Sequence, residues 1–224
     1  MKKTITIIFT CIISVSAIAQ NNKEEIKREN IEWTDIWISN GNKNDLPRVL
    51  LIGDSQSRGY SKMVENKMND KFYVARIASS TGIIDPVLFD EIKTYLIHYK
   101  FAVIHFNNGL HGIEYSLAQY EAGMNKLIKL LKKYGKGAKL VCATSTPVLP
   151  GYSSWKTKDE FNKKLIESRN AIVQKICAKN AIEIDDLYSL VKGHTEWYKD
   201  DKIHFTEAGY NALSDKVVES LMKN

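Results

Sequence analysis

The chain has 224 residues, of which 44% are apolar and 26% charged. This size suits one domain with a buried core, and the composition excludes a disordered or low-complexity chain. No run of eighteen apolar residues occurs, which excludes a protein with several membrane-spanning helices. The formal charge of +6 raises the question of a nucleic-acid partner. We expect no specific one, because the lysines are spread among acidic residues and the densest cluster, Lys129, Lys132 and Lys133, is typical of a solvated helix face.

The first nineteen residues have the pattern of a secretory signal peptide. Two lysines at positions 2 and 3 precede an apolar stretch at 5–18, which ends in the small–x–small sequence Ala17-Ile18-Ala19. Cleavage there predicts a periplasmic or extracellular protein with no membrane attachment. An uncleaved N-terminal anchor is the alternative. A lipoprotein attached through Cys11 is disfavoured, because Phe9 and Thr10 stand where small residues are needed.

Loss of this segment would leave two cysteines, Cys142 and Cys177. Their positions in an apolar run and a helical pattern are compatible with two buried thiols or with a bridge. The sequence has no Cys-x-x-Cys pair and no histidine-rich cluster. We therefore expect neither a metal site nor a cofactor. The oligomeric state is not predicted by any feature of the sequence.

The remaining chain divides into a polar lead-in at 20–45 and one domain at 46–224. In the lead-in, we expect Trp33 and Trp37 to dock onto the core. Apolar runs then alternate with helical patterns, which predicts a three-layer α/β/α sandwich with about five parallel strands. The expected strands are Val49–Ile52, Tyr73–Ala75, Phe101–Phe106, Leu140–Ala143 and Ile182–Ile184. The expected helices are Pro86–Tyr99, Tyr115–Tyr134, Asp159–Lys179 and Thr206–Met222, the last capped by Thr206.

A candidate nucleophile follows the first strand in Gly53-Asp54-Ser55-Gln56-Ser57. Ligand sites of parallel sheets collect at the carboxyl ends of strands. The glycine allows a sharp turn there, and Ser55 would lie at a helix N-terminus, which favours developing negative charge. The same tripeptide also makes ordinary turns and helix caps, so the pattern is weak by itself.

A carboxylate and a histidine stand three residues apart before the last helix, as Asp201 and His204. This spacing lets the aspartate orient the imidazole while the other ring nitrogen acts as base toward a serine. A capping or surface histidine is the plainer alternative, and Asp200 is a less suitable partner. A third polar group, Asn107-Asn108, follows the third strand. These asparagines either build a turn or present an amide N–H to an oxyanion.

Together these residues resemble the SGNH, or GDSL-type, hydrolase superfamily over the whole domain from Arg48 onward. Its first block, Gly-Asp-Ser-x-Ser, matches Gly53–Ser57, and its last, Asp-x-x-His, matches Asp201 and His204. The resemblance implies a flavodoxin-like SGNH fold, Ser55 as nucleophile, and His204 with Asp201 as base and orienting carboxylate. No cofactor or metal is implied.

The oxyanion hole is less well matched. The third block, Gly-x-Asn-Asp, matches only in part, with Phe106 for the glycine, Asn108 for the oxyanion asparagine and Gly109 for the aspartate. The second block normally supplies a glycine N–H. By spacing from the strand, Ser80 takes its place, with Gly82 as the alternative.

The resemblance implies acyl transfer to Ser55 followed by hydrolysis. Exported members most resemble carbohydrate O-acetylesterases, so we expect a small-molecule or polysaccharide ester as substrate. Candidate substrate contacts are Asn107, His111, Trp155 and Trp197, each of which could equally be structural. Lipase, lysophospholipase or thioesterase activity is the alternative within enzymes. An inactive domain that binds glycans or a protein partner is the alternative outside them.

Overall fold

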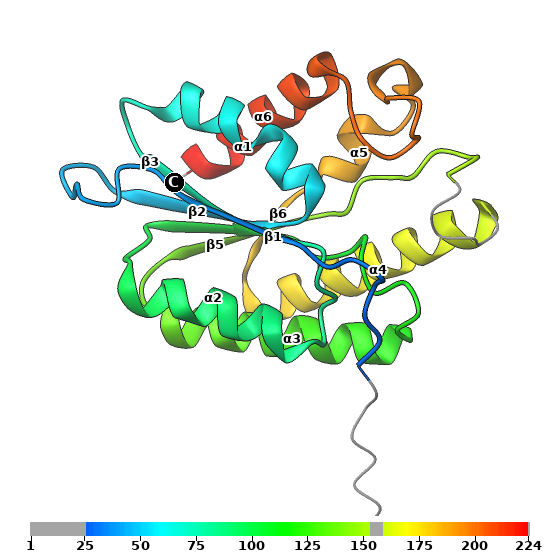
Figure 1. Ribbon diagram of the computed structural model, residues 1–224, viewed down its shortest axis with the longest axis horizontal. Coiled ribbons are helices and arrows are strands. Elements are labelled where there is room, and N and C mark those ends of the chain that lie inside the picture. The colour runs from blue at the N-terminus through cyan, green and yellow to red at the C-terminus, as the bar shows by residue number, and fades with distance from the viewer. Residues whose placement is uncertain (1–25, 153–158, 224) are drawn as a thin grey trace, which may run out of the picture.

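The computed structural model describes residues 26–152 and 159–223. The predicted signal peptide at 1–19, the first residues of the lead-in and the candidate contact Trp155 lie outside the described residues. The described chain forms a sheet with helices on both faces, which confirms the predicted three-layer α/β/α architecture (Figure 1).

The sheet has six strands in the order β1-β3-β2-β4-β5-β6. Five of them, β2 to β6, are parallel, and β1 pairs antiparallel with β3 at one edge. Each of the five predicted strands is present, although β3 extends further than its apolar run predicted. The strands are β1 Thr34–Ile38, β2 Arg48–Gly53, β3 Tyr73–Ser79, β4 Val103–Phe106, β5 Lys139–Ala143 and β6 Glu183–Asp185.

The sixth strand, β1, belongs to the polar lead-in segment, in which no strand was predicted. Its sequence alternates, so Ile36 and Ile38 are half-buried and pack against the core. The expectation that both tryptophans dock onto the core is wrong for Trp37. That side chain leaves the strand between the two isoleucines and is 52% exposed, whereas Trp33 is half-buried.

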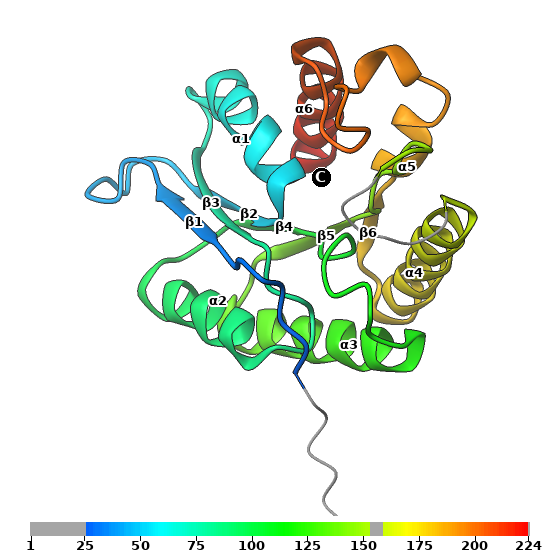
Figure 2. The same cartoon turned by 45° about the vertical axis from the view of Figure 1, so that its right-hand side comes forward.

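The helices form two layers, which Figures 1 and 2 show on opposite sides of the sheet. Helices α1, α5 and α6 cover one face, and α2, α3 and α4 cover the other. The four predicted helices are present, whereas the limits of α1 and the short α5 and η1 were not predicted. The helices are α1 Ser55–Met68, α2 Pro86–His98, α3 Leu117–Tyr134, α4 Asp159–Asn180, α5 Leu187–Val191, η1 Thr195–Trp197 and α6 Glu207–Met222.

Each face of the sheet has its own core because successive side chains of a strand point in opposite directions. In β2, Val49 and Leu51 face α1 and α6, while Leu50 and Ile52 face α2 and α3. All four are essentially unexposed. The second of these cores also contains Cys142 and Cys177, which are buried free thiols in this structure.

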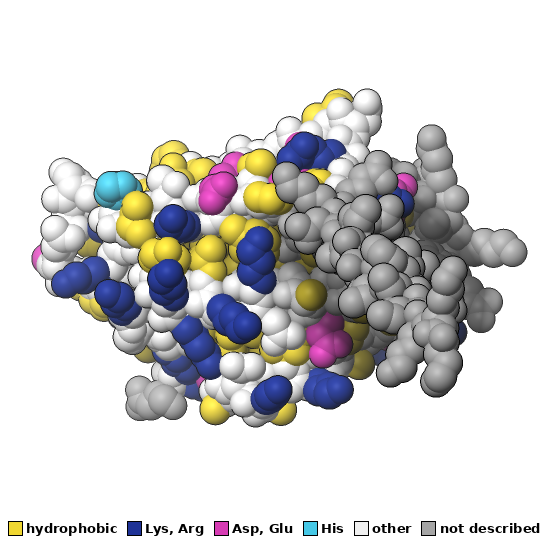
Figure 3. Space-filling view, turned by 90° about the horizontal axis from the view of Figure 1, so that it is seen from below, with side chains coloured by type: hydrophobic (Ala, Val, Ile, Leu, Met, Phe, Trp, Pro, Cys, Tyr) yellow, Lys and Arg dark blue, Asp and Glu magenta, His cyan; other side chains and the backbone are white. Residues whose placement is uncertain are grey.

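The outer surface of α2 and α3 carries many lysines with apolar side chains between them (Figure 3). Some of these lysines lie over aromatic rings, such as Lys126 over Phe89 at 4.1 Å and Lys133 over Tyr134 at 5.1 Å. Across 26–152 and 159–223, none of the helices has both the length and the apolar character that a membrane span requires.

Helices α1 and α6 meet at Gly59, where an added Cβ would overlap the Tyr210 ring. We predict that Gly59→Ala destabilises the protein by about 1–3 kcal/mol through overpacking, despite the better helix propensity of alanine. Denaturant unfolding measures this change.

The control is the same substitution in a Tyr210→Ala background. There the ring is gone, so Gly59→Ala should instead stabilise the protein by up to about 1 kcal/mol. An equal loss of stability in both backgrounds would show that Gly59 serves some purpose other than the close approach.

Candidate active site

The polar residues singled out in the sequence gather at one edge of the sheet. The strands β2, β4 and β5 are parallel, so the loops that follow them leave from the same edge. Strand β2 is followed along the chain by β3 on one side and then by β4 on the other. Ser55 and Asn107 therefore lie at the point where the strand order reverses, which is where open α/β sheets bind ligands.

Ser55 is the first residue of α1 and is half-buried. Before it, Asp54 caps the helix by accepting a hydrogen bond from the Gln56 N–H at 2.9 Å. Gly53 is required by the turn, because an added Cβ would lie 2.7 Å from the Ser57 Oγ. The backbone N–H of Ser55 donates to no atom of the described residues and remains available at the positive end of the helix.

The loop before α6 brings Asp201 and His204 to this serine. His204 Nε2 lies 2.9 Å from Ser55 Oγ, and His204 Nδ1 lies 2.8 Å from Asp201 Oδ2. The other carboxylate oxygen of Asp201 accepts the backbone N–H groups of Ile203 and His204 at 3.1 and 2.9 Å. The three side chains thus form one continuous hydrogen-bonded chain, although Ser55 stands about 150 positions before His204 in the sequence.

Two features hold this loop in place. Lys202 adopts a left-handed backbone with φ of 67°, which is uncommon for a residue with a side chain and tightens the turn between Asp201 and His204. Gln56, the residue after the serine, donates from Nε2 to the Ile203 carbonyl at 2.8 Å. The helix that carries the serine is therefore tied directly to the loop that carries the histidine.

The electrostatics favour an ionised aspartate. Partial burial would raise the pKa of the Asp201 carboxyl, but hydrogen bonds from the backbone and ring of His204 and from the Ile203 N–H outweigh burial and lower the pKa. An ionised Asp201 fixes the proton on His204 Nδ1 and leaves Nε2 free to accept the Ser55 proton. Asp200, the alternative partner, is exposed and its side chain bonds to none of the described residues.

The structure does not support Ser80 as an oxyanion donor. Its backbone N–H donates to the Trp33 carbonyl at 3.0 Å, because the segment leading into β1 pairs with this loop. The backbone N–H of the alternative residue, Gly82, has no acceptor among the described residues although the residue is buried. A buried N–H without a partner is costly, so Gly82 is the better candidate for a donor that a bound oxyanion would satisfy.

Asn108 and Gly82 are alternatives as oxyanion donors. Asn108 is only 3% exposed, and its Nδ2 donates to the Thr81 carbonyl at 3.0 Å. The peptide between Thr81 and Gly82 is trans, so its C=O and N–H point in opposite directions. The Asn108 amide and the Gly82 N–H therefore lie on opposite sides of this peptide and cannot both face one oxyanion.

The amide of Asn107 is engaged within the protein. It follows β4 directly and is half-buried, and its backbone N–H donates to the Ile52 carbonyl at the end of β2. Its Nδ2 donates to the Ala143 carbonyl at 2.7 Å and lies 3.2 Å from Ser145 Oγ. An amide nitrogen can only donate, so both N–H groups of Asn107 already have acceptors within the protein.

Sequence reasoning missed Arg169 of α4, which supports the loop after β4. The side chain is fully buried and donates to the carbonyls of Gly109, His111 and Gly112 at 3.0, 3.0 and 2.6 Å. The guanidinium also lies over the Tyr120 ring. No local motif could have revealed these contacts, because they join residues about sixty positions apart.

His111 lies on the supported loop and contacts the N-terminal segment. Its Nδ1 lies 2.7 Å from Glu29 Oε1, and its ring meets the Trp33 ring edge-on at 6.4 Å. Burial would lower the pKa of His111, but the hydrogen bond to Glu29 and the charges of Asp54 and Glu29 outweigh it, so the pKa is raised.

Trp197, a predicted substrate contact, is partly buried and packs against the core on the α1 and α6 side of the sheet. Its ring stacks on His194 at 3.8 Å, and its backbone carbonyl accepts the Thr206 N–H at 2.7 Å. The described part of the chain contains no group of three or more histidine, cysteine or acidic side chains suited to a metal ion.

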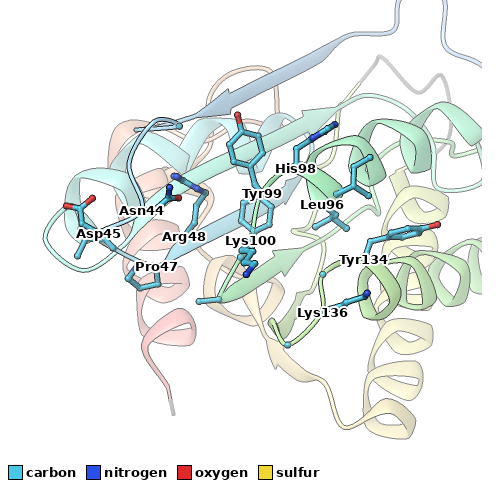
Figure 4. A pocket seen from close by; sticks show the side chains of 17 residues that line it. Asn44, Asp45, Pro47, Arg48, Leu96, His98, Tyr99, Lys100, Tyr134 and Lys136 are labelled. Carbon is cyan, nitrogen blue, oxygen red and sulfur yellow. The ribbon is translucent and has the colours of Figure 1, made fainter.

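A large hollow of about 1340 Å³ lies at the opposite edge of the sheet, where β2, β4 and β5 begin (Figure 4). Arg48 lines it, but this guanidinium already donates to the carbonyls of Ser39, Asn40 and Lys43. The hollow is thus separate from the triad, and its buried charge is satisfied by the protein.

A three-layer sandwich with a Ser–His–Asp chain at the carboxyl edge of its sheet defines a serine hydrolase of the α/β/α class. The family model described as GDSL-like lipase/acylhydrolase matches residues 102–212, which span β4 to α6 and include Asp201 and His204. The chain belongs to this family and is a carboxylic ester hydrolase. None of the curated proteins gives a significant match.

Solved structures share the fold at low identity. An acetyl xylan esterase, AlAXEase, is 16% identical with a TM-score of 0.61 over 78% of this chain and all of its own. An aryl esterase from M. smegmatis is 15% identical with a TM-score of 0.65 over 78% and 98%. A lipase/acylhydrolase from Enterococcus faecalis is 17% identical with a TM-score of 0.64 over 79% and 95%.

Both asparagines should matter mainly for stability. We predict that Asn107→Ala and Asn108→Ala each lower the free energy of unfolding by about 1–3 kcal/mol, because each removes hydrogen bonds within the protein. The loss of kcat should stay well below the roughly hundredfold that removal of one oxyanion donor gives. Ester hydrolysis and denaturant unfolding of both variants test this, and a loss of kcat of about a hundredfold at unchanged stability in Asn108→Ala would make Asn108 the donor.

The raised pKa of His111 gives a second test. The imidazole should titrate above its ordinary pKa of about 6.5, and Glu29→Gln should lower the midpoint. The stabilisation from this pair is fully present below the unfolded pKa and is lost as pH rises through the folded pKa. Histidine NMR titration measures the midpoint, with His111→Gln to assign the signal. Glu114→Gln, on the same loop and paired with Lys27 at 3.5 Å, is the matched control and should leave the midpoint unchanged.

Proposed function

We propose that this protein is an exported serine esterase that removes O-acetyl groups from carbohydrates through an acyl-serine intermediate. One observation carries the catalytic part of the proposal. Ser55, His204 and Asp201 form a hydrogen-bonded chain beside two uncommitted backbone N–H groups, those of Ser55 and Gly82.

The first half of the reaction forms the acyl-serine. Ser55 Oγ attacks the ester carbonyl carbon while its proton passes to His204 Nε2, and the carbonyl oxygen becomes an oxyanion. Asp201 stabilises the resulting imidazolium through Nδ1. The N–H groups of Ser55 and Gly82 stabilise the oxyanion. The tetrahedral intermediate then collapses and the bond between the acyl carbon and the sugar oxygen breaks. His204 gives its proton to that oxygen, so the sugar leaves with a free hydroxyl.

The second half restores the enzyme. His204 Nε2 takes a proton from water, and the oxygen of that water attacks the acyl carbon. A second oxyanion forms in the same place and collapses with loss of Ser55 Oγ, which recovers its proton from His204. Acetate leaves, and no cofactor or metal is needed to balance these steps.

The preference for an acetylated sugar over a lipid has three supports. The predicted signal peptide would send the protein to where polysaccharides are met. Arg58 lies one turn after Ser55 on α1 and is linked through Trp33 to His111 and Glu29, and such polar surroundings suit a hydroxyl-rich alcohol better than an apolar chain. An esterase acting on acetyl xylan is among the proteins with the same fold.

The chain from Gln20 to Asn224 should hydrolyse p-nitrophenyl acetate, and Ser55→Ala should lose nearly all of that activity while remaining folded. The rate should fall for longer acyl esters, and acetate should be released from acetylated oligosaccharides. Equal rates for the wild type and Ser55→Ala would refute the esterase and leave an inactive binding domain. Faster hydrolysis of long acyl chains would favour a lipase-like enzyme instead.

A further inference from the structure

Arg58 differs from the other arginines of the chain in having no polar partner. All five arginines lie within the described ranges. Four of them donate to protein oxygens: Arg28 to Asp85, Arg76 to Asp35, and Arg48 and Arg169 to backbone carbonyls. The guanidinium of Arg58 makes no hydrogen bond or ion pair with a described residue, although the side chain is held in a defined place.

Its position is set by α1 and by an aromatic ring. Arg58 lies three residues after Ser55, which is one helical turn away on the same helix face. Its guanidinium carbon lies 4.5 Å from the centre of the Trp33 ring. A guanidinium resting on an aromatic face keeps its N–H edge free, and that edge matches a carboxylate in a two-point hydrogen bond.

Trp33 in turn is fixed by the second loop of the site. Its backbone N–H donates to Ser80 Oγ at 2.9 Å, and its carbonyl accepts the Ser80 N–H at 3.0 Å. The edge of the same ring faces His111 on the third loop. The guanidinium of Arg58 therefore rests on a ring that contacts the loops carrying Ser80 and His111, one helical turn from Ser55.

None of the described carboxylates of this region is paired with Arg58. Glu29 pairs with His111 and Asp201 with His204, and Asp54 caps α1 through Oδ1 while its buried Oδ2 makes no bond. Glu32 lies 3.6 Å from Arg28. The positive charge of Arg58 is thus left without a fixed counter-charge one turn from the nucleophile.

We propose that Arg58 binds a carboxylate on the alcohol part of the substrate, so that the esterase prefers acidic sugars such as a uronic acid. This specificity rests on the proposed function and adds the charge of the sugar to it. Arg58 lies one helical turn from the reacting serine, so its contribution appears in substrate binding and in kcat/KM.

The test follows acetate release from two substrates that differ at the carboxyl group, which is charged in the first and neutral in the second: a mono-O-acetylated methyl glucuronoside and its methyl ester. The wild type should hydrolyse the acid with a kcat/KM about tenfold higher than the ester, the effect of one charged hydrogen-bonded contact. Arg58→Gln should abolish this preference by lowering kcat/KM for the acid to the value for the methyl ester.

Lys62→Gln is the matched control, because Lys62 lies one turn further along the same helix face and is exposed. It removes the same charge and should keep the preference for the acid. A wild type without preference, or an Arg58→Gln variant slowed equally on the acid and the ester, would overturn the proposal. Loss of the preference in Lys62→Gln as well would point to general attraction by positive charge and would also overturn it.

A binding measurement separates this proposal from the esterase activity. Methyl glucuronoside should bind Ser55→Ala more tightly than methyl glucoside does, and Arg58→Gln in that background should remove the difference, as followed by NMR titration. Binding without hydrolysis of any ester would refute the proposed function and keep the subsite. Hydrolysis with no selective binding would refute the subsite and keep the function.

Discussion

The close packing of α1 against α6 is the contact on which the site depends. Ser55 opens the first of these helices, and His204 stands in the loop that enters the second. Because Gly59 has no side chain, the Tyr210 ring can lie against the α1 backbone. This approach, together with the bond from Gln56 to the Ile203 carbonyl, brings groups from the two ends of the domain within 2.9 Å. Catalytic geometry here follows from a packing contact outside the reacting groups.

Much of the fold could be predicted because burial on both faces leaves a clear trace in sequence. The strands β2, β4 and β5 are apolar runs between helical patterns, which is how parallel sheets read. The edge strand β1 was not predicted, since its residues are mostly half-exposed and polar residues precede it. The five-residue α5 is too short to show a helical period. Contacts with residues far away in the chain, and not the local sequence pattern, determine these two elements.

The active site likewise has a part that could be predicted from the sequence and a part that could not. Ser55, Asp201 and His204 could be proposed from short motifs, because helix starts and tight turns impose local spacing. The oxyanion donors could not, since the availability of an N–H depends on what else pairs with it. Ser80 loses its N–H to Trp33, a residue nearly fifty positions away, and Asn108 gives its amide to Thr81. Gly82 emerges as a candidate only once those bonds are known.

The N-terminal segment therefore does more than lead into the domain. By pairing with the end of β3, it occupies the Ser80 N–H, whereas the Gly82 N–H keeps no acceptor among the described residues. The same pairing places Trp33 under Arg58 and beside His111. This short segment thus affects both the binding of the oxyanion and the binding of the rest of the substrate. It selects which N–H can meet the oxyanion, and it orients the side chains that meet the rest of the substrate. A change in β1 pairing should accordingly alter turnover and substrate choice together, because both depend on the two hydrogen bonds between Trp33 and Ser80.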